Sequence, residues 1–156
     1  MGGSFYDSIR EITAILNNGR NAREGLQFVL RTTVRALNAD AGLIMLLDKT
    51  RENMVRVATY GLTEWYLRKG MVSAKNICLS EVLAGRTVAI LEATQDPLVT
   101  HPEVARQAGI ASILSSPLMY KGEVLGAIRV YSRQPREFHK RDKAFLITAA
   151  SIAAAE

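Results

Sequence analysis

The stretch SSPLMYKGEVLGAIRVYS, residues 115–132, predicts two apolar strands joined by a tight turn. The predicted turn has three residues, Lys121, Gly122 and Glu123, and its glycine adopts the positive φ that such a loop needs. Successive side chains of a strand point to opposite faces of the sheet. The second strand therefore has one face of Val124, Gly126, Ile128 and Val130 and another of Leu125, Ala127, Arg129 and Tyr131. We expect the first face, which is apolar or glycine throughout, to pack against helices.

Apolar periodicity on both sides of this hairpin predicts the remaining elements. Helices are predicted at residues 5–16, 21–37, 64–68, 77–84, 103–108 and 139–156, and strands at residues 41–48, 54–61, 87–93, 111–120 and 124–132. The strand at 41–48 is apolar at nearly every position, which requires cover on both faces of the sheet. The order predicts an α+β fold with a central, mostly antiparallel sheet of five to six strands. We expect the N- and C-terminal helices on one face, and short helices and loops from Gly61 to Gly109 forming a pocket on the other.

Composition predicts a single domain from a reducing compartment. The 156 residues, 48% of them hydrophobic, suffice for one core, so we expect one domain over residues 1–156. We expect residues 1–3 to be a cloning remnant and the last helix to be truncated. The net charge of +5 is scattered over all segments, which does not favour a nucleic-acid partner. Cys78 is the only cysteine, which fits a reducing compartment. The sequence shows no signal-peptide pattern and no apolar run of membrane length, so we expect a cytoplasmic protein that binds no membrane.

Several segments carry a resemblance to a known family. GIASILSSPLMYKGEVLGAIRVYS, REF and RDKAFLITAASIAA, which follow one another within residues 109–154, resemble the closing half of a GAF domain, a sensory module of signalling proteins. The resemblance extends to ADAGLIMLLD as the first strand and VLAGRTVAILEATQDP as the central helix, strand and loop, so it spans essentially the whole chain. The residues that carry it are Gly85, Asp96, Pro97, Gly109, Ser112, Pro117, Leu118, Gly122, Gly126 and Phe138. Each also has a structural role, so the resemblance predicts the fold better than the ligand.

The resemblance implies several classes of ligand, each of which leaves marks in a sequence. Members bind cyclic nucleotides, bilins, haem, non-haem iron, metabolites or anions, and many bind nothing. The cyclic-nucleotide signature is absent, and Cys78 is followed by Leu79 where bilin-binding members have a histidine. His101 and His139 are the candidate haem ligands, and Asp96 is the only carboxylate of the loop TQDPLVTHP, whereas an iron site needs several converging ligands. The sequence identifies no cofactor and no metal site.

The resemblance also includes an enzyme, which reduces free methionine sulfoxide with pocket cysteines. That chemistry passes through a sulfenic acid, which a second thiol must resolve. Cys78 has no second thiol in this chain, and no catalytic residue is identified.

Arg129 is the charged residue in the hairpin that requires an explanation. A buried arginine needs a carboxylate or an anionic ligand, because a desolvated charge without a partner is costly. An ion pair with Asp96 or Glu92, exposure at a sheet edge and contact with an anionic ligand are the alternatives. The candidate pocket residues are Cys78, Asp96, His101, Ser115 and Arg129.

These observations favour a non-catalytic domain that senses a small molecule or anion. It would transmit the change to an effector domain outside this chain, as in a sensor kinase or a transcriptional regulator. Apolar stripes on the terminal helices favour a homodimer; they are Phe5, Ile9, Ile12 and Leu16 at one end and Phe145, Ala149 and Ile152 at the other. The alternatives are a ligand-free structural dimerisation module and a redox enzyme related to free methionine sulfoxide reductase.

Overall fold

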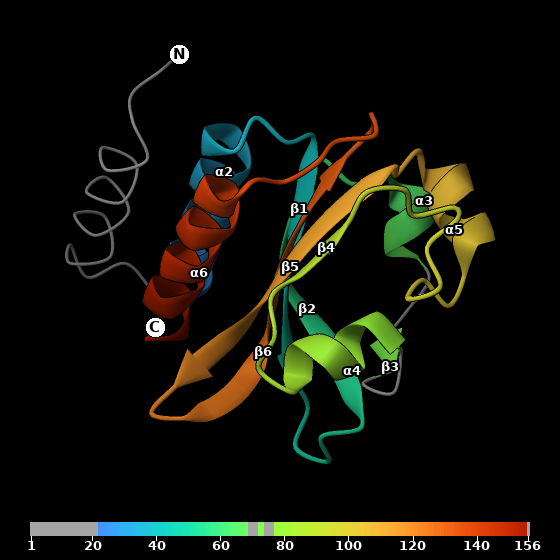
Figure 1. Ribbon diagram of the computed structural model, residues 1–156. Coiled ribbons are helices and arrows are strands. Elements are labelled where there is room, and N and C mark those ends of the chain that lie inside the picture. The colour runs from blue at the N-terminus through green and yellow to red at the C-terminus, as the bar shows by residue number, and fades with distance from the viewer. Residues whose placement is uncertain (1–21, 69–71, 74–76, 156) are drawn as a thin grey trace.

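The computed structural model describes residues 22–68, 72–73 and 77–155 (Figure 1). The helices are α2 (Ala22–Ala36), α3 (Glu64–Leu67), α4 (Ile77–Leu83), α5 (Pro102–Ala108) and α6 (Lys140–Ala154), and the strands are β1 (Ala41–Leu47), β2 (Asn53–Tyr60), β3 (Val72–Ser73), β4 (Val88–Ile90), β5 (Ser112–Tyr120) and β6 (Glu123–Ser132). Every element predicted within these residues is present, and the two-residue strand β3 is an addition. The helix predicted at residues 5–16 lies outside the described residues. Within those residues, no helix is long and apolar enough to cross a bilayer.

The strands form one antiparallel sheet in the order β3-β2-β1-β6-β5-β4. Its two central strands, β1 and β6, pair from Ala41 opposite Tyr131 to Leu46 opposite Gly126. Glycine is required at position 126 because a Cβ atom there would collide with the carbonyl oxygen of Met45. The predicted α+β fold with a mostly antiparallel sheet of five to six strands is confirmed.

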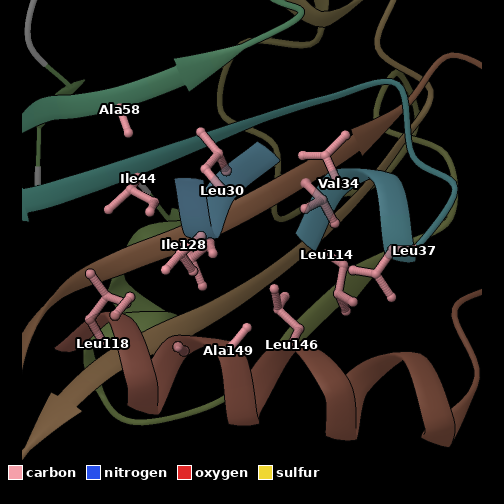
Figure 2. Close-up of a cluster of buried hydrophobic side chains, with 14 of the residues drawn as sticks. Leu30, Val34, Leu37, Ile44, Ala58, Leu114, Leu118, Ile128, Leu146 and Ala149 are labelled. Carbon is pink, nitrogen blue, oxygen red and sulfur yellow. The ribbon is translucent and has the colours of Figure 1, made fainter. Parts of the chain in front are cut away.

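Helices α2 and α6 cover one face of the sheet, which we call the helix side (Figure 1). Figure 2 shows the apolar cluster between them and the sheet; its members include Leu30, Val34, Leu37, Ile44, Leu114, Leu118, Ile128, Leu146 and Ala149. Phe138, just before α6, is buried in the same cluster. The apolar stripe predicted for the C-terminal helix, Phe145, Ala149 and Ile152, therefore packs onto the sheet of its own chain.

Helices α3, α4 and α5 cover the opposite face, which we call the loop side (Figure 1). A second buried apolar cluster lies here; it includes Leu43, Met45, Met54, Leu79, Val82, Ile90, Ile110 and Ile113. Ala127 and Tyr131 of β6 belong to this loop-side cluster, whereas Ile128 and Val130 belong to the helix side. The predicted alternation along this part of β6 is confirmed.

The β5–β6 hairpin differs from its prediction in the turn. Tyr120 pairs with Glu123, which leaves Lys121 and Gly122 as a two-residue loop instead of the three residues expected. Both have positive φ, 52° and 80°. Two residues of positive φ form the type I′ turn, whose twist matches that of the flanking strands.

A register shift in the same hairpin redirects one side chain. Leu118 lies opposite Gly126 and Met119 lies opposite Val124, so Leu125 is an extra residue on β6. Leu125 packs against the helix-side cluster. Its predicted place on the face of Arg129 is therefore wrong, because simple alternation does not pass through a bulge.

Candidate functional site

Arg129 lies on the central strand β6 and points to the loop side, where it is 8% exposed. Its Nε donates to the Ser115 Oγ at 2.9 Å, and its Nη2 donates to the Cys78 Sγ at 3.5 Å. Ser115 is its partner across the β5–β6 pairing, and Cys78 lies on α4. The guanidinium is thus held between the sheet and the helix that covers it.

Two tyrosines extend this cluster toward α3. Tyr131 lies on the same face of β6 as Arg129, and its hydroxyl is 3.1 Å from that of Tyr66 on α3. The two rings meet edge to face, with centroids 6.1 Å apart and planes at 71°. We call Arg129, Ser115, Cys78, Tyr66 and Tyr131 the Arg129 network.

The Arg129 network carries a positive charge that no carboxylate of the described residues compensates. Burial alone would lower the pKa of Arg129, but Tyr131, Cys78 and Tyr66 raise it by more, and the net shift is upward. Burial and Tyr66 raise the pKa of Tyr131 well above 10.0, and they outweigh the lowering effect of Arg129. The phenol is therefore neutral at physiological pH, while the guanidinium stays charged.

A second guanidinium reaches the loop side from β2. The Nη1 of Arg56 donates to the carbonyl oxygen of Leu67 at 3.1 Å, and its Cζ lies 5.9 Å from the centroid of the Tyr66 ring. Its Nε is buried and has no hydrogen-bond partner among the described residues. The sequence prediction omitted Arg56, although it lies between Val55 and Val57 in a strand with alternating faces.

Neither guanidinium forms an ion pair with a carboxylate in the described part of the chain. The alternative that paired Arg129 with Asp96 or Glu92 is wrong: the Oδ1 of Asp96 accepts from the backbone N–H of Leu98 at 2.8 Å, within its own loop. Exposure at a sheet edge is also wrong, since β6 lies between β1 and β5. An anionic ligand is the alternative that this geometry leaves open.

The structure brings together three of the five predicted pocket residues, Cys78, Ser115 and Arg129. Asp96 and His101 lie outside the Arg129 network. The His101 side chain is 65% exposed at the start of α5, with its Nδ1 3.4 Å from the Oε1 of Glu103. The described residues contain no group of three or more His, Cys, Asp or Glu that could hold a metal ion. A ligand role for Asp96 or His101 stays a prediction.

Tyr66 and Tyr131 also line a depression that is open to solvent. Its other walls include Asp40, Gly61, Thr63, Gly109 and Arg133. It lies where the segment before α3 meets the end of α5 and the end of β6. The tyrosine pair therefore connects the buried arginine with a space that solvent reaches.

Comparisons with known proteins agree with this architecture. The sequence matches the GAF domain family model over residues 19–155. The GAF domain from a phosphoenolpyruvate-protein phosphotransferase of Coxiella burnetii is similar, with a TM-score of 0.85 at 24% identity over 98% of this chain and 92% of that chain. For the GAF domain of the Acinetobacter phosphoenolpyruvate-protein phosphotransferase, the TM-score is 0.79 at 21% identity, over 96% of this chain and 90% of that chain.

A similar structure also occurs in an enzyme. The free methionine-R-sulfoxide reductase of Neisseria meningitidis, in complex with its substrate, gives a TM-score of 0.81 at 16% identity, over 97% of this chain and 86% of that chain. No curated protein matches the sequence significantly. At these identities the structural likeness shows a shared fold.

Proposed function

The chain belongs to the GAF domain family, and from this premise we propose that it is a non-catalytic sensory domain that binds a small anion on the loop side of its sheet. GAF domains are typically sensory or regulatory parts of larger proteins. The observation that supports the anion is Arg129, a buried guanidinium whose hydrogen-bond partners are the Ser115 hydroxyl and the Cys78 thiol. An anion would supply the counter-charge, through charge-assisted hydrogen bonds that are stronger than those with neutral acceptors.

The proposal includes transmission of the signal to an effector domain outside this chain, in a cytoplasmic sensor kinase or transcriptional regulator. Its structural support is the central strand β6. Arg129 faces the loop side, and its neighbours Ile128 and Val130 pack in the helix-side cluster with α2 and α6. A shift of β6 at the ligand would therefore act directly on the packing of the helices.

We also propose that the domain forms a homodimer through its terminal helices. Phe145 and Ala149 are buried against their own sheet, so this part of the predicted stripe does not face a second subunit. The solvent-exposed face of α6 is the better candidate: from Ala144 onward it consists of Ala144, Ile147, Thr148 and Ser151, with no charged side chain. Ile147, a large apolar residue, is 46% exposed.

Light scattering at high protein concentration tests the homodimer. We expect a dimer for the wild type and a monomer for Ile147→Lys, because a lysine at the centre of the contact would bury a charge. Thr148→Ala, which keeps the face uncharged, is the matched control and should leave the dimer intact. A wild-type monomer at high concentration would contradict the helical interface.

A thermal-shift screen of carboxylates, phosphates and nucleotides tests the sensory function. A ligand of the native state adds stability as RT ln(1 + [L]/Kd), about 2.7 kcal/mol at a concentration one hundred times Kd. We expect a saturable rise in Tm for the wild type and none for Arg129→Gln. Arg51→Gln is the control, because Arg51 is exposed and pairs with Glu123 away from the network.

Two results, one from that screen and one from an activity assay, would favour the alternatives. If no anion raises the Tm of the wild type and Arg129→Gln behaves identically, the ligand-free structural module is the better description. Turnover of free methionine sulfoxide that is abolished by Cys78→Ser would instead establish a redox enzyme.

A further inference from the structure

Arg56 and Arg129 present their side chains on the same face of the sheet. Arg129 lies opposite Leu43 of β1, and Arg56 lies opposite Met45, two residues further along the same strand. Paired residues of adjacent strands share a face, and both Leu43 and Met45 belong to the loop-side cluster. The contacts of Arg56 with α3 and of Arg129 with α4 agree with this placement.

The pairing also fixes the separation of the two arginines. Strand β1 lies between their strands, so their Cα atoms are about 10 Å apart across the sheet and about 7 Å apart along it. Their backbones are therefore about 12 Å apart in all. Two guanidiniums anchored this far apart form two positive centres, with the Tyr66 ring against Arg56 and the Tyr66 hydroxyl against Tyr131.

Both centres have hydrogen-bonding capacity that the described residues do not use fully. The Nε of Arg56 is buried and has no hydrogen-bond partner among the described residues. Arg129 interacts there with the neutral Ser115 hydroxyl, Cys78 thiol and Tyr131 phenol, and none of these supplies a carboxylate. The other described arginines that form ion pairs, Arg51, Arg68, Arg86 and Arg136, are all more exposed than Arg129. A buried cation gains more from a counter-charge than an exposed one. Arg129 is buried and Arg56 is half-buried with a buried Nε, so an acidic partner from outside the chain fits both centres.

We propose that Arg56 and Arg129 bind a single small molecule with two separated acidic groups, for which a linear dicarboxylate is the simplest representative. Arg129 holds one acidic group beside Ser115, and the free Nε–H of Arg56 holds the other. Tyr66 links the two centres, because its ring lies against Arg56 and its hydroxyl is 3.1 Å from that of Tyr131, which shares the face of Arg129. This inference rests on the proposed sensory function and adds the ligand class and the second anchoring residue.

The test measures dissociation constants by calorimetry for the linear dicarboxylates from malonate to adipate. Monocarboxylates of the same carbon number and inorganic phosphate are measured alongside. For the wild type, we expect the best dicarboxylate to bind at least tenfold more tightly than the matched monocarboxylate. In Arg56→Gln, which removes the charge but keeps an amide donor, dicarboxylate affinity should fall to that of the monocarboxylate, whose own affinity should be unchanged.

Controls separate this inference from the proposed function. Arg129→Gln should abolish binding of both ligand classes, and Arg51→Gln should leave both affinities at the wild-type value. Equal affinities for mono- and dicarboxylates, insensitive to Arg56→Gln, would overturn the two-centre inference and leave the proposed anion sensor standing. A second contrary outcome is that inorganic phosphate binds most tightly and loses its affinity in both Arg56→Gln and Arg129→Gln. That result would overturn the two-centre inference, because it would show that both arginines hold one multiply charged group. If no anion binds the wild type, both proposals fail.

Discussion

The two faces of the sheet differ in whether a buried arginine has a carboxylate partner. Beside the helix-side cluster, Arg136 lies 4.8 Å from the centroid of the Phe138 ring and 3.7 Å from the Oδ1 of Asp142. These two charged side chains are 28% and 10% exposed. On the loop side Arg129 is buried more deeply, yet no carboxylate of the described chain pairs with it. Within the described residues, the more exposed arginine therefore has a carboxylate partner and the more buried one has none, which is the reverse of what stability favours.

This difference separates the residues that maintain the fold from those available for a ligand. The helix-side cluster consists of apolar side chains contributed by both helices and the sheet. The loop side has a comparable apolar cluster, but it surrounds a guanidinium whose desolvation is not offset within the described chain. Substitutions on the two sides should therefore change stability and ligand binding in different proportions.

The largest effect on stability is expected for Leu146→Ala on the helix side. Leu146 of α6 is 0% exposed in the cluster of Figure 2, so its truncation leaves a cavity. We expect the free energy of unfolding to fall by about 3 kcal/mol. Urea denaturation measures this loss, and anion affinity measured well below the transition should stay at the wild-type value. A tenfold loss of affinity would show that the two faces are not independent.

Arg136→Met should produce the next largest effect. The substitution keeps an apolar stem over Phe138 but leaves Asp142 without its cation. We expect the free energy of unfolding to fall by about 2 kcal/mol, because an uncompensated, mostly buried carboxylate is costly. Comparison with Asp142→Asn in the same denaturation experiment provides the control, since the double variant should lose less than the sum of the two single losses.

Arg129→Met is the matched substitution on the loop side, and it should have the opposite sign. It removes a buried charge that no carboxylate of the described residues pairs with, at the cost of one hydrogen bond to Ser115 and one to Cys78. We expect the unfolding free energy in the absence of anion to stay the same or to rise by up to about 1 kcal/mol. A loss as large as that of Arg136→Met would mean that Arg129 serves the fold, and the contrast between the faces would disappear.

The fold was largely predictable because each helix and strand has its own apolar periodicity in the sequence. The apolar periodicity of α2, β1 and α6 follows directly from the faces that each element buries. The features that the sequence did not predict depend on how strands pair, which no local sequence pattern specifies. Strand β3 exists only through two pairs with β2, and the β5–β6 turn length and the position of Leu125 depend on a register shift.

The candidate site was predictable only where strand geometry determines it. Alternation and pairing place Arg129 beside Ser115, and Cys78 reaches both because α4 covers that part of the sheet. Asp96 and His101 lie in the segment between β4 and α5, which has no periodicity. Their positions follow from local hydrogen bonds and exposure, such as the Asp96 contact with Leu98.

The smallest expected effect is a dependence of stability on alkaline pH, and it comes from the loop side alone. Burial raises the pKa of Tyr131 above its usual 10.0, so the folded state retains a proton that the unfolded state loses as the pH passes 10. The stability from this group is complete below about pH 9 and declines above it, by up to about 1 kcal/mol at pH 10.5. Tyr131→Phe should remove this part of the slope, whereas Leu146→Ala should lower stability equally at every pH. If Tyr131→Phe keeps the wild-type slope in urea denaturation between about pH 8 and 10.5, the phenol is not protected by burial. The Arg129 network would then be open to water, and its charge would not need an anion.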